Sequence, residues 1–356
     1  MGSSIFGLFF VIVIIVIVVG IILQLSKSGS RFGSPQRGPR RRISLPNRKP
    51  PEFLGVPKQH PARAVSERLE AVLTVDFEER IKDRVLKINP AMREGEWQWQ
   101  WFELKRYFLM CAILRGVPMY SVKVDVVWHE MLMFTREYEQ FCKQLCGGLI
   151  HHAPHAADAK PDPGERAWFD WVYGELFEST PVSGQLWGSF YRVPLQEERI
   201  RDLDGLSREQ LKDQLFNHKA AELFPDIHAA AAYLIDRGKR LATEARRGDR
   251  RSSTDDSAYQ SQWQDASMMT GLLSGAFFFS SLHDSGDFNR QMDDAQTKEQ
   301  REHNSSCGSS SYVCSSDNNG GHNCSSSSCS SGGGDGGSSC GGSSCGGGGC
   351  GGGGGD

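Results

Sequence analysis

The sequence predicts an all-α protein with a single N-terminal transmembrane helix, a cytoplasmic helical domain and a disordered C-terminal tail rich in Gly, Ser and Cys. Three observations support this. The first 25 residues are almost entirely apolar, the last 50 hold 19 of the 40 Gly and 7 of the 10 Cys, and apolar residues recur every three or four positions between them. The expected segments are an anchor (1–25), a basic tether (26–63), a helical domain (64–247), a polar linker (248–303) and the tail (304–356).

The N-terminal anchor is expected at Ile5–Leu23, whose 19 residues carry no charge; a helix needs roughly 20 to cross a bilayer. No basic side chain precedes the segment and no good cleavage site follows it, so we expect it to be retained. Residues 26–63 hold ten Lys or Arg against one acid, Glu52. This flank predicts a cell-membrane protein with its N-terminus outside, its main domain cytoplasmic and a disordered tether attracted to anionic lipid headgroups.

The helical domain is predicted from apolar periodicity and from capping residues. Ser66 can cap a first helix that ends at Pro90, and Gly116 and Gly147 can take left-handed caps after later helices. A weak alternation at 186–193 is the best strand candidate. The expected helices span 66–90, 97–116, 121–146, 165–177, 207–218 and 226–246, with Trp97 and Trp101 in the core.

Composition and motifs favour a non-enzymatic protein. The net charge of −3 argues against a specific nucleic-acid partner. Outside the tail there is no P-loop, dinucleotide fingerprint, HExxH, GxSxG or CxxC motif. We therefore expect a membrane-tethered interaction or scaffold protein whose protein partner the sequence does not identify.

The alternative is a metal-binding or metal-dependent protein. Asp125 and His129 stand four residues apart on an expected helix and are therefore neighbours. The sequence HHAPH supplies His151, His152 and His155 after a glycine break, so these five residues are the candidate ligands of a divalent metal such as zinc. No residue is assigned a catalytic role.

The weak point of this metal site is distance. If the helix runs unbroken to Cys146, its end lies about 25 Å beyond His129. Either the histidine loop must then fold back to reach His129, or the helix must break earlier. A structural interpretation competes, with His129 as a buried, hydrogen-bonded core residue and HHAPH as a surface turn. Acid–base catalysis is a further alternative. Cys142 and Cys146 are either additional soft ligands or small core residues.

The run VDVVWHEMLMFTREYEQFC, followed by two glycines and HHAP, resembles the core motif of the glycine-rich domain-containing proteins, a family of unknown function. The resemblance spans roughly 90–190 and implies a helical domain without an established reaction. Many relatives have a second His where this chain has Met131. The matching positions are Val124, Asp125, Trp128, His129, Tyr138, Gly147 and a histidine at 151 or 152.

Two segments after residue 247 complete the prediction. Residues 267–282 are apolar but short and interrupted by glycines, so we expect them to lie on the membrane or to pack on the domain, with a second crossing as the alternative. The tail offers almost nothing to bury and is expected to be disordered. Its cysteines, several of them five residues apart, form a low-complexity repeat that differs from zinc-finger spacing.

Overall fold

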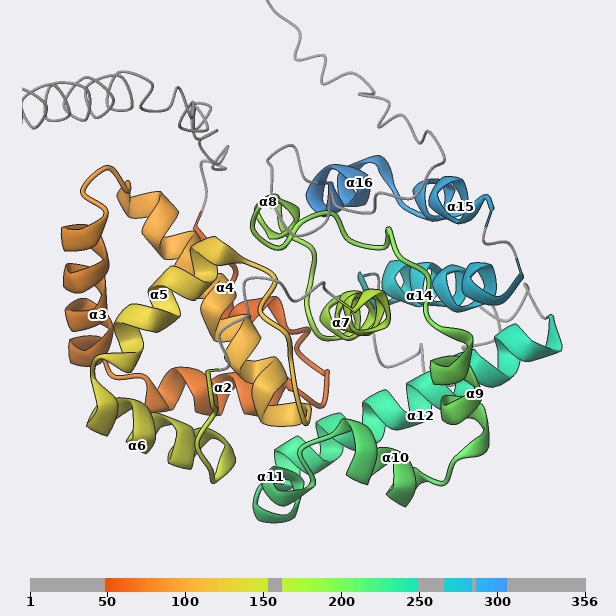
Figure 1. Cartoon of the computed structure of the whole chain (residues 1–356), viewed down its shortest axis with the longest axis horizontal. Helices are drawn as coiled ribbons and strands as arrows, with labels where there is room; N and C mark the ends of the chain where they lie inside the picture. Colours follow the sequence, from red (N-terminus) through yellow and green to blue (C-terminus); the bar gives the residue numbers. More distant parts are fainter. Residues whose placement is uncertain (1–48, 153–161, 249–265, 284–285, 306–356) are drawn as a thin grey trace, which may run out of the picture. The chain divides into compact units, whose positions relative to one another are not determined.

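The computed structural model describes residues 49–152, 162–248, 266–283 and 286–305, and within these ranges it contains helices and no strand, which confirms the all-α prediction for the domain. Figure 1 shows their arrangement. The helices are η1 (Glu52–Gly55), α2 (Arg63–Val72), α3 (Val75–Ile88), α4 (Glu94–Ile113), α5 (Val122–Leu132), α6 (Thr135–Cys146), α7 (Pro163–Leu176), α8 (Ser183–Trp187), α9 (Glu197–Gly205), α10 (Arg208–Leu215), α11 (His218–Leu223), α12 (Pro225–Arg247), α14 (Ala266–His283), α15 (Phe288–Asp294) and α16 (Lys298–Asn304).

Helix α4 is buried on nearly all sides, because its sequence is apolar around most of its circumference. Trp97 and Trp101 are 1% and 2% exposed and their rings stack at 5.5 Å, as predicted for core residues. The helix packs against α2, α5, α11 and α12. It therefore joins the first half of the domain to the second.

Helix α12 is the longest described element and packs against α9, α10, α11 and α14 (Figure 1). Its bounds confirm the helix predicted at 226–246. Helix α7 likewise confirms the helix predicted at 165–177. Ser207 and Gln210 form the predicted capping box at the start of α10, and Gly147 takes the left-handed conformation that ends α6 (φ 77°).

Two of the predicted helices are each broken in two. The helix expected at 66–90 divides at Thr74, whose side chain accepts a hydrogen bond from the Phe77 backbone N–H and so caps α3. The helix expected at 121–146 divides at Met133 and Phe134 into α5 and α6. The Phe134 ring packs edge-on against Phe77 at 5.8 Å, and the break brings α5 beside α3 and α6 beside α2.

One smaller prediction, the helix cap at Gly116, is wrong, and the weak strand candidate is not a strand. Helix α4 ends at Ile113, before Gly116, because the backbone turns extended at Leu114 and pairs with residues 215 and 216 of another segment. The strand candidate at 186–193 begins in α8 and continues as irregular chain. There Arg166 donates hydrogen bonds to the carbonyls of Trp187 and Ser189, which replaces strand pairing.

The membrane prediction is also corrected. No helix in the described part of the chain is long and apolar enough to cross a membrane, so the single-pass topology and the cell-membrane localisation with a cytoplasmic main domain are contradicted there. The predicted anchor at 5–23 and most of the basic tether lie outside the described residues.

The apolar segment 267–282 packs on the domain as part of α14. Its Leu273, Phe277 and Phe278 are buried, and the Phe278 ring meets Trp171 of α7 at 5.4 Å. Helices α15 and α16 follow it, so much of the expected linker 248–303 is helical and belongs to the packed structure. The tail beyond residue 305 lies outside the described residues.

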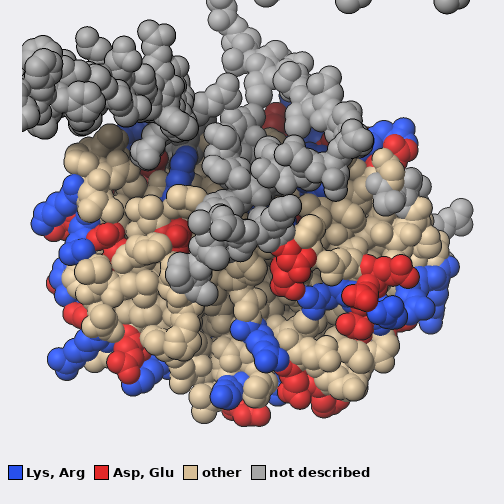
Figure 2. Space-filling model, in the orientation of Figure 1, with Lys and Arg blue, Asp and Glu red and all other residues tan. Residues whose placement is uncertain are grey.

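The surface drawn in Figure 2 carries basic and acidic side chains interspersed, without a broad patch of one sign among the residues that are coloured. Some basic and acidic side chains of the described residues form ion pairs between helices. Arg84 of α3 pairs with Glu130 of α5 at 2.8 Å, and Arg80 pairs with Glu137 of α6 at 2.9 Å. These pairs lie across the α3–α5–α6 contact, and Glu130 directly follows the candidate ligand His129 in sequence.

Candidate metal centre

Three of the five predicted metal ligands lie together. Asp125 and His129 stand one turn apart on α5, and His152 follows α6. One ligand atom from each of the three residues lies within 4.8 Å of the other two. The imidazole rings of His129 and His152 are 4.4 Å apart between centroids. The predicted group of residues is therefore partly assembled in space.

The return of the chain explains how His152 reaches α5. The break at residues 133–134 lets α6 run as a separate helix instead of continuing away from His129. Gly147 then ends α6 with a positive φ, and a Cβ at this position would lie 2.5 Å from a Leu223 methyl carbon. Of the two alternatives, the structure shows the earlier helix break, with α5 ending at Leu132 and α6 beginning at Thr135.

The contacts within the group differ from the predicted pair. The Asp125 carboxylate is closest to His152, with Oδ1 at 2.7 Å from Nε2, and its Oδ2 lies 3.4 Å from His129 Nδ1. His129 Nδ1 lies 2.8 Å from the backbone carbonyl oxygen of Asp125. When Nδ1–H donates to that carbonyl, Nε2 keeps its lone pair, which is the usual arrangement of a metal-binding histidine.

Exposure is graded across the three side chains. His129 is 51% exposed, Asp125 27% and His152 10%. The interpretation of His129 as a buried core histidine is therefore wrong. His152 packs its ring edge-on against Trp128 at 4.5 Å, so one side of the group rests on the core and the other faces solvent. This geometry suits an ion that also binds water.

The remaining predicted ligands do not join the group. His151 is exposed and is not among the three converging residues. His155 lies outside the described residues. Cys142 and Cys146 are buried, and the Cys146 thiol lies 3.3 Å from the carbonyl oxygen of Gly148. The Cys146 thiol thus contacts a backbone atom of the chain that leads to His152.

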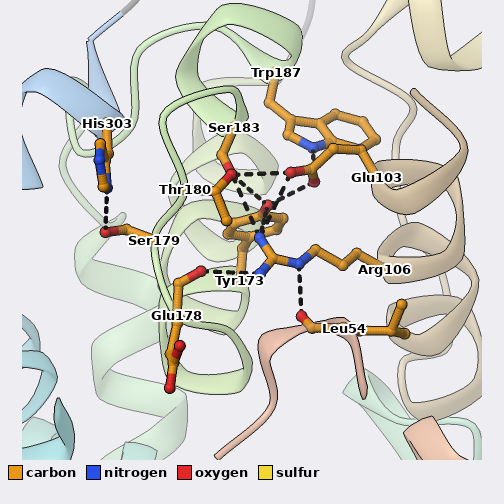
Figure 3. A network of polar contacts seen from close by, with 10 residues as sticks. All are labelled: Leu54, Glu103, Arg106, Tyr173, Glu178, Ser179, Thr180, Ser183, Trp187 and His303. Atoms are coloured by element: carbon orange, nitrogen blue, oxygen red, sulfur yellow. Dashed lines mark hydrogen bonds and ion pairs between the residues drawn. The ribbon is translucent and has the colours of Figure 1, made fainter. Parts of the chain in front are cut away.

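A second polar cluster, which the sequence reasoning missed, lies between α4, α7 and α8 (Figure 3). The Glu103 carboxylate accepts hydrogen bonds from Tyr173 (2.6 Å), Trp187 (2.8 Å) and Ser183 (2.9 Å). Arg106, one turn later, donates to the Leu54 carbonyl at 2.8 Å. The sequence signal that could have revealed this cluster was the presence of Glu103 and Arg106 within the mostly apolar stretch of α4.

This buried cluster has a structural character. Glu103 and Arg106 are both fully buried and lie 3.5 Å apart. Arg106 also donates to the Tyr173 hydroxyl and to the Glu178 carbonyl, so its guanidinium is surrounded by protein acceptors. Such groups join helices and offer a ligand nothing to bind.

A surface hollow of about 680 Å³ lies elsewhere, between α7, α9 and the chain after α4. Its two arginines already have partners. Arg199 pairs with Glu165 at 2.9 Å and lies over the Trp168 ring, and Arg115 donates to the Asp213 carbonyl at 3.2 Å. None of the three candidate metal ligands lines this hollow.

Comparison with known proteins gives one match. Residues 67–168 match a protein-family model described as UCP032817-like. The matched range includes Asp125, His129 and His152. No curated protein matches the chain, and no solved structure matches it. The resemblance to the glycine-rich domain-containing proteins stays a prediction, and no function follows from the matched model.

Proposed function

We propose that this protein binds a divalent transition-metal ion of the zinc type through Asp125, His129 and His152. The observation that supports the proposal is the convergence of one carboxylate and two imidazoles from separate stretches of chain, with ligand atoms within 4.8 Å of one another. Imidazole nitrogen and carboxylate oxygen are common ligands of zinc.

The distances suit a site that needs only a small adjustment on binding. Ligand atoms bound to zinc at 2.0–2.2 Å stand roughly 3.3 Å apart in a tetrahedron. The Asp125–His152 contact of 2.7 Å therefore opens slightly as an ion enters between the two atoms. The exposed His129 ring closes over the ion by side-chain rotation, which costs little because half of that side chain faces solvent.

Three protein ligands leave a fourth position on the ion. Zinc sites of this kind hold water or a small ligand there, and the ion lowers the pKa of the bound water. The partial exposure of Asp125 and His129 leaves access to that position from solvent. The proposed role is thus a metal-binding domain with one open coordination position.

The test is zinc affinity measured by chelator competition in the full chain. Because thiolates also bind zinc, the seven cysteines after residue 305 are replaced by serine in every variant. We expect one tight site per chain. His129→Ala and His152→Ala should abolish tight binding, and Asp125→Asn should weaken it, because a neutral amide oxygen is a poorer zinc ligand than a carboxylate oxygen.

His151→Ala is the matched control, because His151 is adjacent to His152 in sequence but lies outside the converging group. It should bind zinc as the parent chain does. Equal zinc affinity in the parent, His129→Ala and His152→Ala proteins, or no tight binding in any of them, would reject the proposal.

The interaction or scaffold function expected from composition stays a prediction. It concerned a tethered helical domain and a multivalent tail, and the tail lies outside the described residues. The membrane-tethered form is not retained, for the reason given above.

A further inference from the structure

One face of α6 carries three buried side chains that contact the chain leading to His152. Tyr138, Cys142 and Cys146 are spaced four residues apart and so lie in one row along the helix. Their exposed fractions are 4%, 0% and 5%. The row faces the segment 147–152, which returns from the end of α6 toward α5.

Each side chain of the row contacts a backbone group of that segment. The Tyr138 hydroxyl donates to the Ile150 carbonyl at 2.5 Å. The Ile150 backbone lies close enough to the Cys142 thiol to lower its pKa against the larger effect of burial, and the Cys146 thiol lies 3.3 Å from the Gly148 carbonyl. The Ile150 carbonyl, two residues before His152, is thus held by a hydrogen bond from α6.

The row is also tied to α5. The Tyr138 hydroxyl accepts a hydrogen bond from Trp128 Nε1 at 3.1 Å, and Trp128 immediately precedes His129. The same indole packs against the His152 ring. One hydroxyl therefore connects the helix that carries two of the ligands to the segment that carries the third.

Burial makes these contacts persistent. Water does not compete for hydrogen bonds inside the core, so each one restrains the segment more strongly than a surface contact would. Burial also raises the pKa of the Cys142 thiol to about 11 and raises the pKa of Cys146. Both cysteines therefore stay protonated at neutral pH and act as weak hydrogen-bonding groups.

We infer that Tyr138, Cys142 and Cys146 are positioning residues for His152, which fix the segment 147–152 so that its imidazole meets Asp125 and His129. The inference rests on the proposed metal site, because it assigns these residues to the assembly of that site. None of the three side chains needs to touch the ion. Their effect is to bring the third ligand to the other two before an ion arrives.

Tyr138→Phe removes the hydroxyl and keeps the ring. We expect Zn²⁺ to bind this variant roughly 10- to 100-fold more weakly than the parent chain, because partners that orient metal ligands typically have effects of this size. We also expect faster amide hydrogen exchange at residues 148–152 without metal. Zinc affinity comes from the chelator competition described above, and exchange from mass spectrometry of the full chain.

Tyr120→Phe is the matched control. The Tyr120 hydroxyl is buried too, but it has no hydrogen-bond partner among the described residues and lies outside the row. This variant should keep the parent's zinc affinity and its exchange at 148–152. If both Tyr→Phe variants lower zinc affinity equally, the effect is general destabilisation and the inference is overturned.

A second variant guards against misfolding of Tyr138→Phe. Cys146→Ala removes the weaker thiol contact, with Cys111→Ala as its control, since Cys111 contacts Tyr107 instead. Faster exchange at 148–152 in Cys146→Ala but not in Cys111→Ala supports the inference. Unchanged exchange in both Tyr138→Phe and Cys146→Ala overturns it. The exchange measurement needs no zinc. A parent chain that binds no zinc would therefore reject the proposed function, and the exchange at 148–152 would still test the positioning role separately.

Discussion

At the scale of single residues, the loss of Arg106 should destabilise the fold strongly. It and Glu103 are fully buried, and the guanidinium lies 3.5 Å from the carboxylate. Arg106→Met leaves that carboxylate buried without its cation, so we expect the free energy of unfolding to fall by about 3–5 kcal/mol. Urea denaturation followed by circular dichroism measures the change.

A surface arginine provides the comparison for this prediction. Arg80 pairs with Asp76 and Glu137, but its side chain is 40% exposed. Arg80→Met should leave the urea midpoint nearly unchanged, because water solvates the remaining carboxylates. If both substitutions lower the urea midpoint equally, the buried Arg106–Glu103 pair stabilises the fold no more than the surface pairs of Arg80 do.

His60 should make stability depend on pH. It is 5% exposed, its Nδ1 accepts from the Ala62 N–H at 3.0 Å, and burial lowers its pKa to about 4. The unfolded chain binds a proton near pH 6.5, where the folded chain does not. Above pH 6.5 the titration of His60 therefore does not lower the stability of the folded chain. As the pH falls toward 4, the free energy of unfolding decreases, by on the order of 3 kcal/mol in total.

Urea denaturation at several pH values between 4.5 and 7.5 checks this dependence. His60→Gln should flatten it. His228→Gln, which changes an exposed histidine of α12, should leave the dependence of the parent chain in place. A His60→Gln protein with the same slope as the parent would assign the pH dependence to other groups.

At the scale of elements, the contact between α8 and α16 depends on a glycine. A Cβ on Gly184 would lie 2.5 Å from the His303 carbonyl oxygen and 2.7 Å from that of Ser305. The Phe190 N–H also donates to the Asn304 carbonyl at 2.9 Å. Close approach of two backbones therefore holds α16 in place beside α8 (Figure 1).

Gly184→Ala should displace α16 and destabilise the protein by about 1–3 kcal/mol, because the clash is with backbone atoms that cannot rotate away. Hydrogen exchange at residues 298–305 should increase. Gly205→Ala is the control, since a Cβ there meets nothing within 4 Å. Unchanged exchange in Gly184→Ala would show that α8 and α16 tolerate a wider separation.

For the whole molecule, the boundary of the stable domain is the testable quantity. A chain that ends at Ser305 should keep the melting temperature of the full protein within about a degree, because the Gly and Ser residues beyond it offer little apolar surface to bury. A chain that ends at Thr297 lacks the buried His303 and Asn304 and should melt several degrees lower. Differential scanning calorimetry compares the two, and a large drop already at Ser305 would show that later residues contribute.

The sequence by itself determined the helical class of the domain and several helix boundaries. These predictions succeeded where the signal is local. The capping box at Ser207, the left-handed Gly147 and the periodicity of α7 and α12 each depend on residues within a few positions of one another. Local hydrogen bonds and side-chain spacing are written directly in the chain.

Only the tertiary structure decided where α5 ends and which ligands meet. No Gly or Pro lies next to Phe134 in the sequence. The helix breaks there where the Phe134 ring packs on Phe77, a residue far away in sequence. That break brings His152 back to Asp125. The physical reason is that periodicity reports which face of a helix is buried, whereas the partner that buries it is chosen by packing between distant segments.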